Sequence, residues 1–209
     1  MIYGFSDNKS LVYHLVNSGV LRTPDIIKAF ENVDRGDFVG NTVISDIYGD
    51  YPLQIGYSQT ISQPTTVAIM LEMLQPRQGQ KILDIGSGSG WTTALLAYIA
   101  GERGFVTGLE RIDPLVEFGN DNLKRYRFSN AKIIKAGAKL GMPGERFDRI
   151  LVSAAAEEFP YELADQLKTG GRLVIPVGSF IFEVAKKENG ELEIFKHYGF
   201  SFVPLILEK

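Results

Sequence analysis

The chain has 209 residues, a formal net charge of −3 at pH 7, and 44% hydrophobic and 22% charged residues. This composition excludes a largely disordered, collagen-like or coiled-coil protein. With no cysteine and two histidines, the chain lacks the groups for a disulfide scaffold, a thiolate zinc site, a cysteine nucleophile or a histidine metal cluster. The balanced charge disfavours nucleic acid as a partner. No apolar run approaches ~18 residues and no basic leader precedes one, so we expect a cytoplasmic chain without a membrane partner.

The first third of the chain predicts helices around one irregular segment. Residues 8–18 carry apolar side chains at helical spacing. Thr23-Pro24-Asp25 is typical of a helix start, with a capping hydroxyl, a proline at the first helical position and an acid. Residues 49–62 show no clear periodicity and indicate an ordered loop. A further helix is expected from Pro64 to about Leu74.

From Lys81 onward, short β-rich runs alternate with helical stretches, which is typical of a parallel sheet with crossover helices. A hairpin at Glu188-Asn189-Gly190 and a loop join the last runs, so antiparallel strands should close one edge. The expected strands are residues 81–85, 105–109, 131–135, 149–153, 171–176, 180–187, 192–198 and 202–207, and the expected helices are 91–100, 114–126 and 161–168.

A glycine-rich segment follows the first of these strands. It reads Asp84-Ile85-Gly86-Ser87-Gly88-Ser89-Gly90 and opens a helix at Trp91, so a ligand can approach the backbone at the carboxyl end of the strand. The next strand ends at Glu110, whose carboxylate can accept both hydroxyls of a ribose. Acidic surroundings favour the cationic sulfonium of S-adenosylmethionine. The predicted cofactor-binding residues are Asp84, Gly86, Ser87, Gly88, Gly90, Glu110 and Arg111.

Other interpretations of these residues stay open. A glycine-rich turn can also pack a helix against a strand without a ligand, and Glu110 is then a solvated acid. A nicotinamide dinucleotide is disfavoured because the third glycine of its fingerprint falls at Trp91.

Three segments carry a resemblance that extends from about Thr23 to Leu207. Residues 51–64 read YPLQIGYSQTISQP, residues 83–90 read LDIGSGSG, and residues 166–178 read QLKTGGRLVIPVG. They are similar to the P-L-P-I-G-x-G-Q-T-I-S-x-P signature, the cofactor loop and the Q-L-x-x-G-G-R-L-V-x-P-V-G stretch of the protein-L-isoaspartate O-methyltransferases. The ending Phe202-Val203-Pro204-Leu205 resembles the same family.

The resemblance implies a class I, S-adenosylmethionine-dependent methyltransferase. Its fold is α/β and Rossmann-like: a mostly parallel seven-stranded sheet with helices on both faces, an antiparallel C-terminal edge and an N-terminal helical extension. We expect one domain over 1–209, with a helical layer and signature loop over 1–75, a cofactor-binding core over 76–178 and antiparallel strands over 179–209.

The implied reaction methylates the α-carboxylate of L-isoaspartyl residues in damaged proteins and peptides, which initiates their repair. That carboxylate is already ionised at neutral pH, so no general base is needed. The transfer requires the carboxylate oxygen to be held in line with the methyl group. Ser62 is the candidate donor to the other carboxylate oxygen, and Thr60 is the neighbouring candidate. Both hydroxyls also have a structural interpretation, as caps ahead of Pro64. Isoaspartyl peptides and proteins are the implied partners, and we expect a monomer.

Two departures from the family pattern bear on the function. Gly137-Ala138-Lys139 stands where the family has G-D-G, so Ala138 takes the place of a cofactor-binding carboxylate. Gln54 and Ser58 replace the common proline and glycine of the signature. The alternatives are a diverged methyltransferase acting on another carboxylate or small molecule, and a non-catalytic paralogue used as a binding module.

The missing carboxylate generates a prediction. Ala138→Asp should tighten S-adenosylmethionine binding by about 1–2 kcal/mol, or roughly tenfold, because it restores an acceptor for the adenosine. Calorimetric titration of both proteins measures this difference. An unchanged dissociation constant would mean that another group already holds the adenosine.

Overall fold

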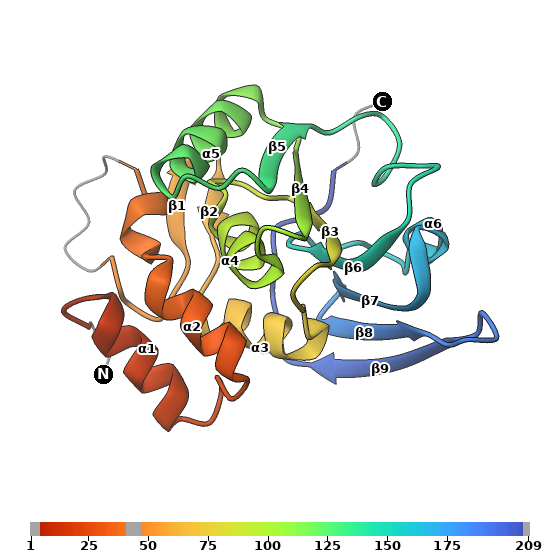
Figure 1. The fold of residues 1–209 in the computed structure, drawn as a ribbon, viewed down its shortest axis with the longest axis horizontal. Coiled ribbons are helices and arrows are strands. Elements are labelled where there is room, and N and C mark those ends of the chain that lie inside the picture. Colours follow the sequence, from red (N-terminus) through yellow and green to blue (C-terminus); the bar gives the residue numbers. More distant parts are fainter. Residues whose placement is uncertain (1–4, 41–46, 207–209) are drawn as a thin grey trace.

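The computed structural model describes residues 5–40 and 47–206, and a seven-stranded sheet forms its centre (Figure 1). The strand order is β5-β4-β3-β6-β7-β8-β9. The strands from β5 to β7 pair in parallel, whereas β8 and β9 are antiparallel and close one edge, as predicted. The bounds are β3 Lys81–Ile85, β4 Phe105–Glu110, β5 Ala131–Lys135, β6 Phe147–Val152, β7 Leu167–Val177, β8 Phe180–Lys186 and β9 Leu192–Tyr198.

The helices begin where the sequence places caps and prolines. Asp7 caps the first helix, and prolines occupy the first turn of the second, third and fifth helices. Among the residues that the structure describes, no helix is both long and apolar enough to cross a membrane. The bounds are α1 Asn8–Asn17, α2 Pro24–Asn32, the 3₁₀ helix η1 Arg35–Phe38, α3 Pro64–Leu74, α4 Trp91–Ala100, α5 Asp113–Arg125 and α6 Tyr161–Asp165.

Alternating strand residues feed two apolar cores, one on each face of the sheet. Ile82 packs into the core shared with α1 to α5, whereas its neighbour Leu83 packs into the core shared with α6. This follows from the two-residue period of a strand, whose successive side chains point to opposite faces. Helices therefore cover both faces, as expected, although most of them lie on one.

The segment 49–62 is more regular than its sequence indicates. It contains an antiparallel hairpin of β1 (Leu53–Gly56) and β2 (Gln59–Ile61), with a register shift between Gln54 and Gly56. Three consecutive residues at its tip, Gly56, Tyr57 and Ser58, have positive φ angles of 94°, 54° and 58°. The expected loop is therefore wrong, because strands this short with an irregular register leave no alternating pattern to detect.

The expected strand over 202–207 is also wrong for its described residues, and Leu207 lies outside them. An isolated bridge joins Pro204 to Ala155, and the segment runs beside the loop after β6. Proline has no N–H to donate to a ladder, so Pro204 prevents a continuous strand here. The predicted helix over 161–168 likewise ends early, at Asp165, because Leu167 pairs with Phe147 as the start of β7.

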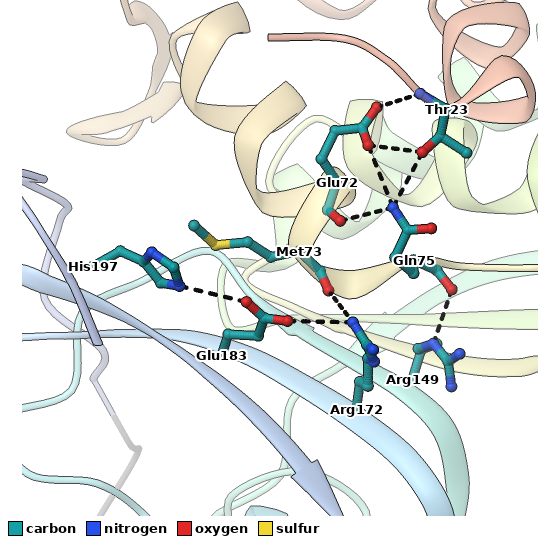
Figure 2. Close-up of polar contacts among 8 residues, drawn as sticks. All are labelled: Thr23, Glu72, Met73, Gln75, Arg149, Arg172, Glu183 and His197. Carbon is teal, nitrogen blue, oxygen red and sulfur yellow. Dashed lines mark hydrogen bonds and ion pairs between the residues drawn. The ribbon is translucent and has the colours of Figure 1, made fainter. Parts of the chain in front are cut away.

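Helix α3 is held at its carboxyl end by two arginines from the sheet (Figure 2). Arg172 donates to the carbonyl of Met73, and Arg149 donates to the carbonyl of Gln75, each at 3.1 Å. The last carbonyls of a helix have no partner within it, and its carboxyl end carries partial negative charge. The two cations therefore satisfy the end of α3 and fix it to β6 and β7.

Glu72 connects the same helix to the N-terminal layer. Its carboxylate accepts hydrogen bonds from the backbone N–H groups of Arg22 and Thr23, both at 2.8 Å, and from the Thr23 hydroxyl at 2.7 Å. Glu72 thus caps the start of α2 from outside that helix (Figure 2). Helices α2 and α3 are joined by this contact as well as by apolar packing.

The left-handed conformation of Ser58 generates a stability prediction. An L-residue pays about 1–2 kcal/mol in this region, whereas glycine adopts it freely. Ser58→Gly should therefore raise the free energy of unfolding by about 1 kcal/mol, or the Tm by about 2–4 °C. Ser18→Gly is the matched control, because Ser18 has an ordinary φ of −74° and should lose stability. Equal destabilisation of both variants in thermal unfolding would contradict this account.

Candidate active site

A cavity that is partly open to solvent lies at the carboxyl ends of the parallel strands. This is the edge where ligands bind in open α/β sheets. The hairpin β1–β2 and the C-terminal segment contribute walls from outside the sheet. The lining residues are 59–62, Val67, 85–89, Trp91, Thr92, 109–111, Ala136, Gly137, 139–141, Ser153, Ala154 and 203–206.

The glycine loop forms the floor of this cavity. Gly86 and Gly88 have φ angles of +77° and +53°, which other residues adopt at a cost. A Cβ atom on Gly88 would lie 3.2 Å from the Ile55 side chain of the hairpin. The hairpin therefore packs closely over the loop, and a side chain at residue 88 would require a small shift of Ile55 as well as an unfavourable φ angle.

Glu110 is held at the cavity wall by backbone N–H groups. Its two carboxylate oxygens accept from Gly88 at 2.9 Å and from Ile112 at 3.0 Å, and the residue is 6% exposed. Each oxygen of an ionised carboxylate has about two acceptor positions. Glu110 therefore keeps capacity for further donors, such as the two hydroxyls of a ribose.

Asp84 lies behind the wall and does not line the cavity. It is fully buried, and one of its oxygens accepts from the hydroxyls of Thr92 at 2.7 Å and Thr93 at 2.6 Å. Its other oxygen has no partner among the described residues. Burial raises the pKa of Asp84 to about 6, and the nearby Glu110 charge adds to this effect, while the two threonine hydroxyls oppose it.

Two further polar groups of the cavity wall are buried without a hydrogen-bond partner in the described part of the chain. They are the Ser87 hydroxyl and the Trp91 indole N–H. Buried polar groups are nearly always satisfied, by protein, water or ligand. Together with the acidic side chains of Glu110 and Asp84, these groups fit a polar, cationic cofactor such as S-adenosylmethionine.

The signature segment contributes Thr60 and Ser62 to the lining of the same cavity. The structure shows a different side chain as the cap of α3 in place of these hydroxyls. Asp50 caps α3, because its carboxylate accepts from the backbone N–H of Thr65 at 2.8 Å and from the Thr65 hydroxyl at 2.7 Å. The hydroxyls of Thr60 and Ser62 are thus not needed to cap α3.

Arg35 anchors the signature segment to the core. Its guanidinium is fully buried and donates to the carbonyls of Ile47 and Gly49, of Tyr51 at 2.9 Å, and of Ser62 at 3.5 Å. It also lies 5.8 Å from the centre of the Trp91 ring. A single side chain therefore joins η1, the signature segment and the start of α4.

Besides Asp84, two predicted cofactor residues, Gly90 and Ala138, lie away from the cavity wall. Gly90 starts α4 with a φ of +89°, and a Cβ there would lie 3.0 Å from Ile133 and 3.1 Å from the Gly119 carbonyl. Its place is thus explained by close packing between α4 and α5. Ala138 lines a separate surface depression that includes Arg146, although its neighbours Gly137 and Lys139 line the cavity. To reach the cofactor, an aspartate side chain at 138 would have to point from this depression toward the cavity.

The structure also adds residues that the sequence did not indicate as site residues. The segment 203–206 closes one side of the cavity and is held by hydrogen bonds of Val203 and Leu205 to Ala155, both at 2.8 Å. The family-like ending was the available signal, but nothing in it showed which part of the fold it contacts. Arg35 had no signal, since a buried arginine and an exposed one look alike in a sequence.

The raised pKa of Asp84 generates a pH prediction. The folded protein binds this proton more tightly than the unfolded chain, whose aspartate has a pKa of about 3.9. The resulting stabilisation is complete below that value and is lost as the pH rises through about 6. Asp84→Asn keeps an acceptor for the threonine hydroxyls and carries no charge. Between about pH 4 and pH 7, the wild type should therefore lose roughly 2–3 kcal/mol of stability relative to this variant.

Urea unfolding of both proteins across this range measures the difference. Asp25→Asn is the matched control, because the Asp25 side chain is 72% exposed on α2. A parallel pH dependence in wild type and Asp84→Asn would show that Asp84 does not titrate as described.

Comparisons with known proteins agree with this arrangement. A family model described as Protein-L-isoaspartate(D-aspartate) O-methyltransferase (PCMT) matches residues 6–209. The protein-L-isoaspartate O-methyltransferase of Pyrococcus abyssi is 41% identical over 206 residues, which cover 96% of this chain and 94% of the relative. That of Methanopyrus kandleri is 41% identical over 205 residues, covering 95% and 91%.

Solved structures give the same result. A Plasmodium falciparum protein-L-isoaspartate O-methyltransferase, crystallised with S-adenosyl-L-homocysteine, superposes with a TM-score of 0.84 at 30% identity. The match covers 97% of this chain and 99% of that one. The fold, the cavity and the nearly full-length matches lead to one conclusion: this chain belongs to the protein-L-isoaspartate(D-aspartate) O-methyltransferase family of S-adenosylmethionine-dependent protein carboxyl O-methyltransferases.

Proposed function

We propose that this protein transfers a methyl group from S-adenosylmethionine to the α-carboxylate of L-isoaspartyl residues in damaged proteins. The observation that supports this most directly is the shared cavity. It brings Glu110 and the glycine loop, which suit the cofactor, together with Ser62 of the substrate-side signature. Methyl transfer requires both reactants in one site with their reacting atoms aligned.

We assign the cofactor to the glycine-loop side of the cavity. The backbone around Gly86 and Gly88 allows close approach, and Glu110 accepts from a ribose. The Ser87 hydroxyl and the Trp91 N–H are donors for the polar end of the ligand. When bound there, S-adenosylmethionine supplies a methyl group made electrophilic by a cationic sulfur. The buried charges of Glu110 and Asp84 favour that cation.

Ser62 has the main role on the substrate side. Its hydroxyl can donate to one oxygen of the carboxylate and leave the other free to attack. The amino end of α3 also favours an anion, but Asp50 already takes the Thr65 N–H and adds a negative charge there. The contribution of the helix terminus is therefore smaller than that of an uncapped helix, and more of the positioning falls to Ser62.

The chemistry ends in an ester rather than in a repaired residue. Methoxide leaves from the ester far more readily than hydroxide leaves from the free acid, so the nitrogen of the following backbone amide can bond to the ester carbon, lose its proton and displace methanol, which forms a succinimide. Hydrolysis of this ring returns part of the residue to normal aspartate. The protein's task is thus limited to selective esterification.

Paired peptides that differ in one residue test this function. The protein is incubated with labelled S-adenosylmethionine and peptides carrying either L-isoaspartate or L-aspartate. We expect base-labile label in the isoaspartyl peptide alone. Ser62→Ala should lower kcat/KM by about 100-fold, since that hydroxyl aims the nucleophile. Ser18→Ala, in the N-terminal layer, is the matched serine control and should keep full activity.

The outcomes separate the candidate functions. Equal labelling of both peptides would contradict isoaspartate specificity. Labelling of neither, by a protein that binds S-adenosylmethionine in calorimetry, would favour a methyltransferase with another substrate. Absence of binding to both S-adenosylmethionine and S-adenosylhomocysteine would favour a non-catalytic paralogue.

A further inference from the structure

The turn between β8 and β9 carries the one Asn-Gly pair of the sequence, Asn189-Gly190, and the chain has no Asp-Gly pair. The turn residues 187–191 are all exposed. Lys187 and Gly190 close the turn through a hydrogen bond of 2.9 Å from the Gly190 N–H to the Lys187 carbonyl. Gly190 has a φ of +85°, which explains why glycine follows the asparagine here.

In a pair of this sequence, the asparagine can convert spontaneously to isoaspartate. Glycine has no side chain to shield its amide nitrogen, so the Gly190 nitrogen can approach the side-chain carbon of Asn189. The Asn189 oxygen accepts a hydrogen bond from Glu191 N–H at 3.1 Å, which draws electron density from that carbon. The bond from Gly190 to Lys187 must first open, and exposed turns open at low free-energy cost.

We propose that Asn189 is a site of isoaspartate formation in this protein, and that the protein methylates its own aged copies there. The Gly190 nitrogen forms a bond to the side-chain carbon of Asn189 and loses its proton, and ammonia leaves as the succinimide forms. Water then opens the ring, and opening at the α-carbonyl gives isoaspartate with a free α-carboxylate. Methyl transfer to that carboxylate rests on the proposed function.

The topology makes this methylation intermolecular. Strand β8 starts at Phe180 beside the end of β7, where Val177 and Ala156 form a bridge near the cavity. It then runs antiparallel to β7, so the turn at Asn189 lies at the end of the sheet opposite to the carboxyl ends of the parallel strands. Seven residues of β8 span about 20 Å. Figure 1 shows this turn projecting from the molecule at the right, away from β1 and β2.

Ageing of the purified full-length protein tests the proposal. Samples aged in mildly alkaline buffer are digested and searched by mass spectrometry for isoaspartate at 189, then mixed with fresh enzyme and labelled S-adenosylmethionine. We expect base-labile label to rise with ageing time and to map to the peptide containing residue 189. Asn189→Gln should lower this labelling by about tenfold or more, since glutamine must close a larger, slower-forming ring. Asn17→Gln, at an exposed residue of α1 followed by serine, is the matched control and should label like wild type.

An external isoaspartyl peptide separates this proposal from the proposed function. Both variants should methylate that peptide at the wild-type rate, because neither residue belongs to the cavity. If the enzyme methylates the external peptide but the aged protein contains no isoaspartate at 189, self-methylation is overturned and the function stands. The same holds if isoaspartate forms at 189 but stays unlabelled. Failure on the peptide would overturn the function itself. Labelling per molecule that does not rise with protein concentration would overturn the intermolecular route.

Discussion

The buried guanidinium of Arg35 is the contact on which the site depends. It donates to carbonyl groups on both sides of the hairpin, those of Gly49 and Tyr51 before it and that of Ser62 after it. Arginine suits this role because its rigid fork presents several donors at once. Removing it would leave several carbonyls without a partner, and a buried unsatisfied group costs about 1–3 kcal/mol. The position of Ser62 over the cavity therefore originates in η1, outside the sheet.

Helix α3 has charged or polar partners at both of its ends. Its amino end follows Ser62 at the cavity, and its carboxyl end rests on Arg149 and Arg172. In the same cavity, Glu110 favours positive charge, and so does Asp84, which is buried behind the cavity wall. A cationic methyl donor therefore finds complementary charge beside Glu110 and Asp84, whereas Asp50 at the amino end of α3 leaves the anionic acceptor more dependent on the Ser62 hydroxyl.

Much of the fold was predictable from local signals. The strands of the parallel sheet, the proline-led starts of α2, α3 and α5, and the antiparallel edge all follow from patterns within about ten residues of chain. The secondary-structure predictions that were wrong fall where the local sequence pattern is weak or where tertiary contacts override it. The hairpin β1–β2 has an irregular register, Pro204 breaks the last strand, and Leu167 leaves its helix to pair with Phe147.

By itself, the sequence determined the fold class and the resemblance to one family, and it predicted the cofactor loop with Glu110 and the hydroxyls of the signature segment as site residues. These depend on short motifs whose residues are neighbours in the chain or lie at successive strand ends. Only the tertiary structure decided that Asp84 sits behind the wall, that Ala138 lies on a different depression, and that the C-terminal segment closes the cavity. The reason is physical: burial and long-range hydrogen bonds join residues far apart in the chain, and no local pattern encodes which of them will meet.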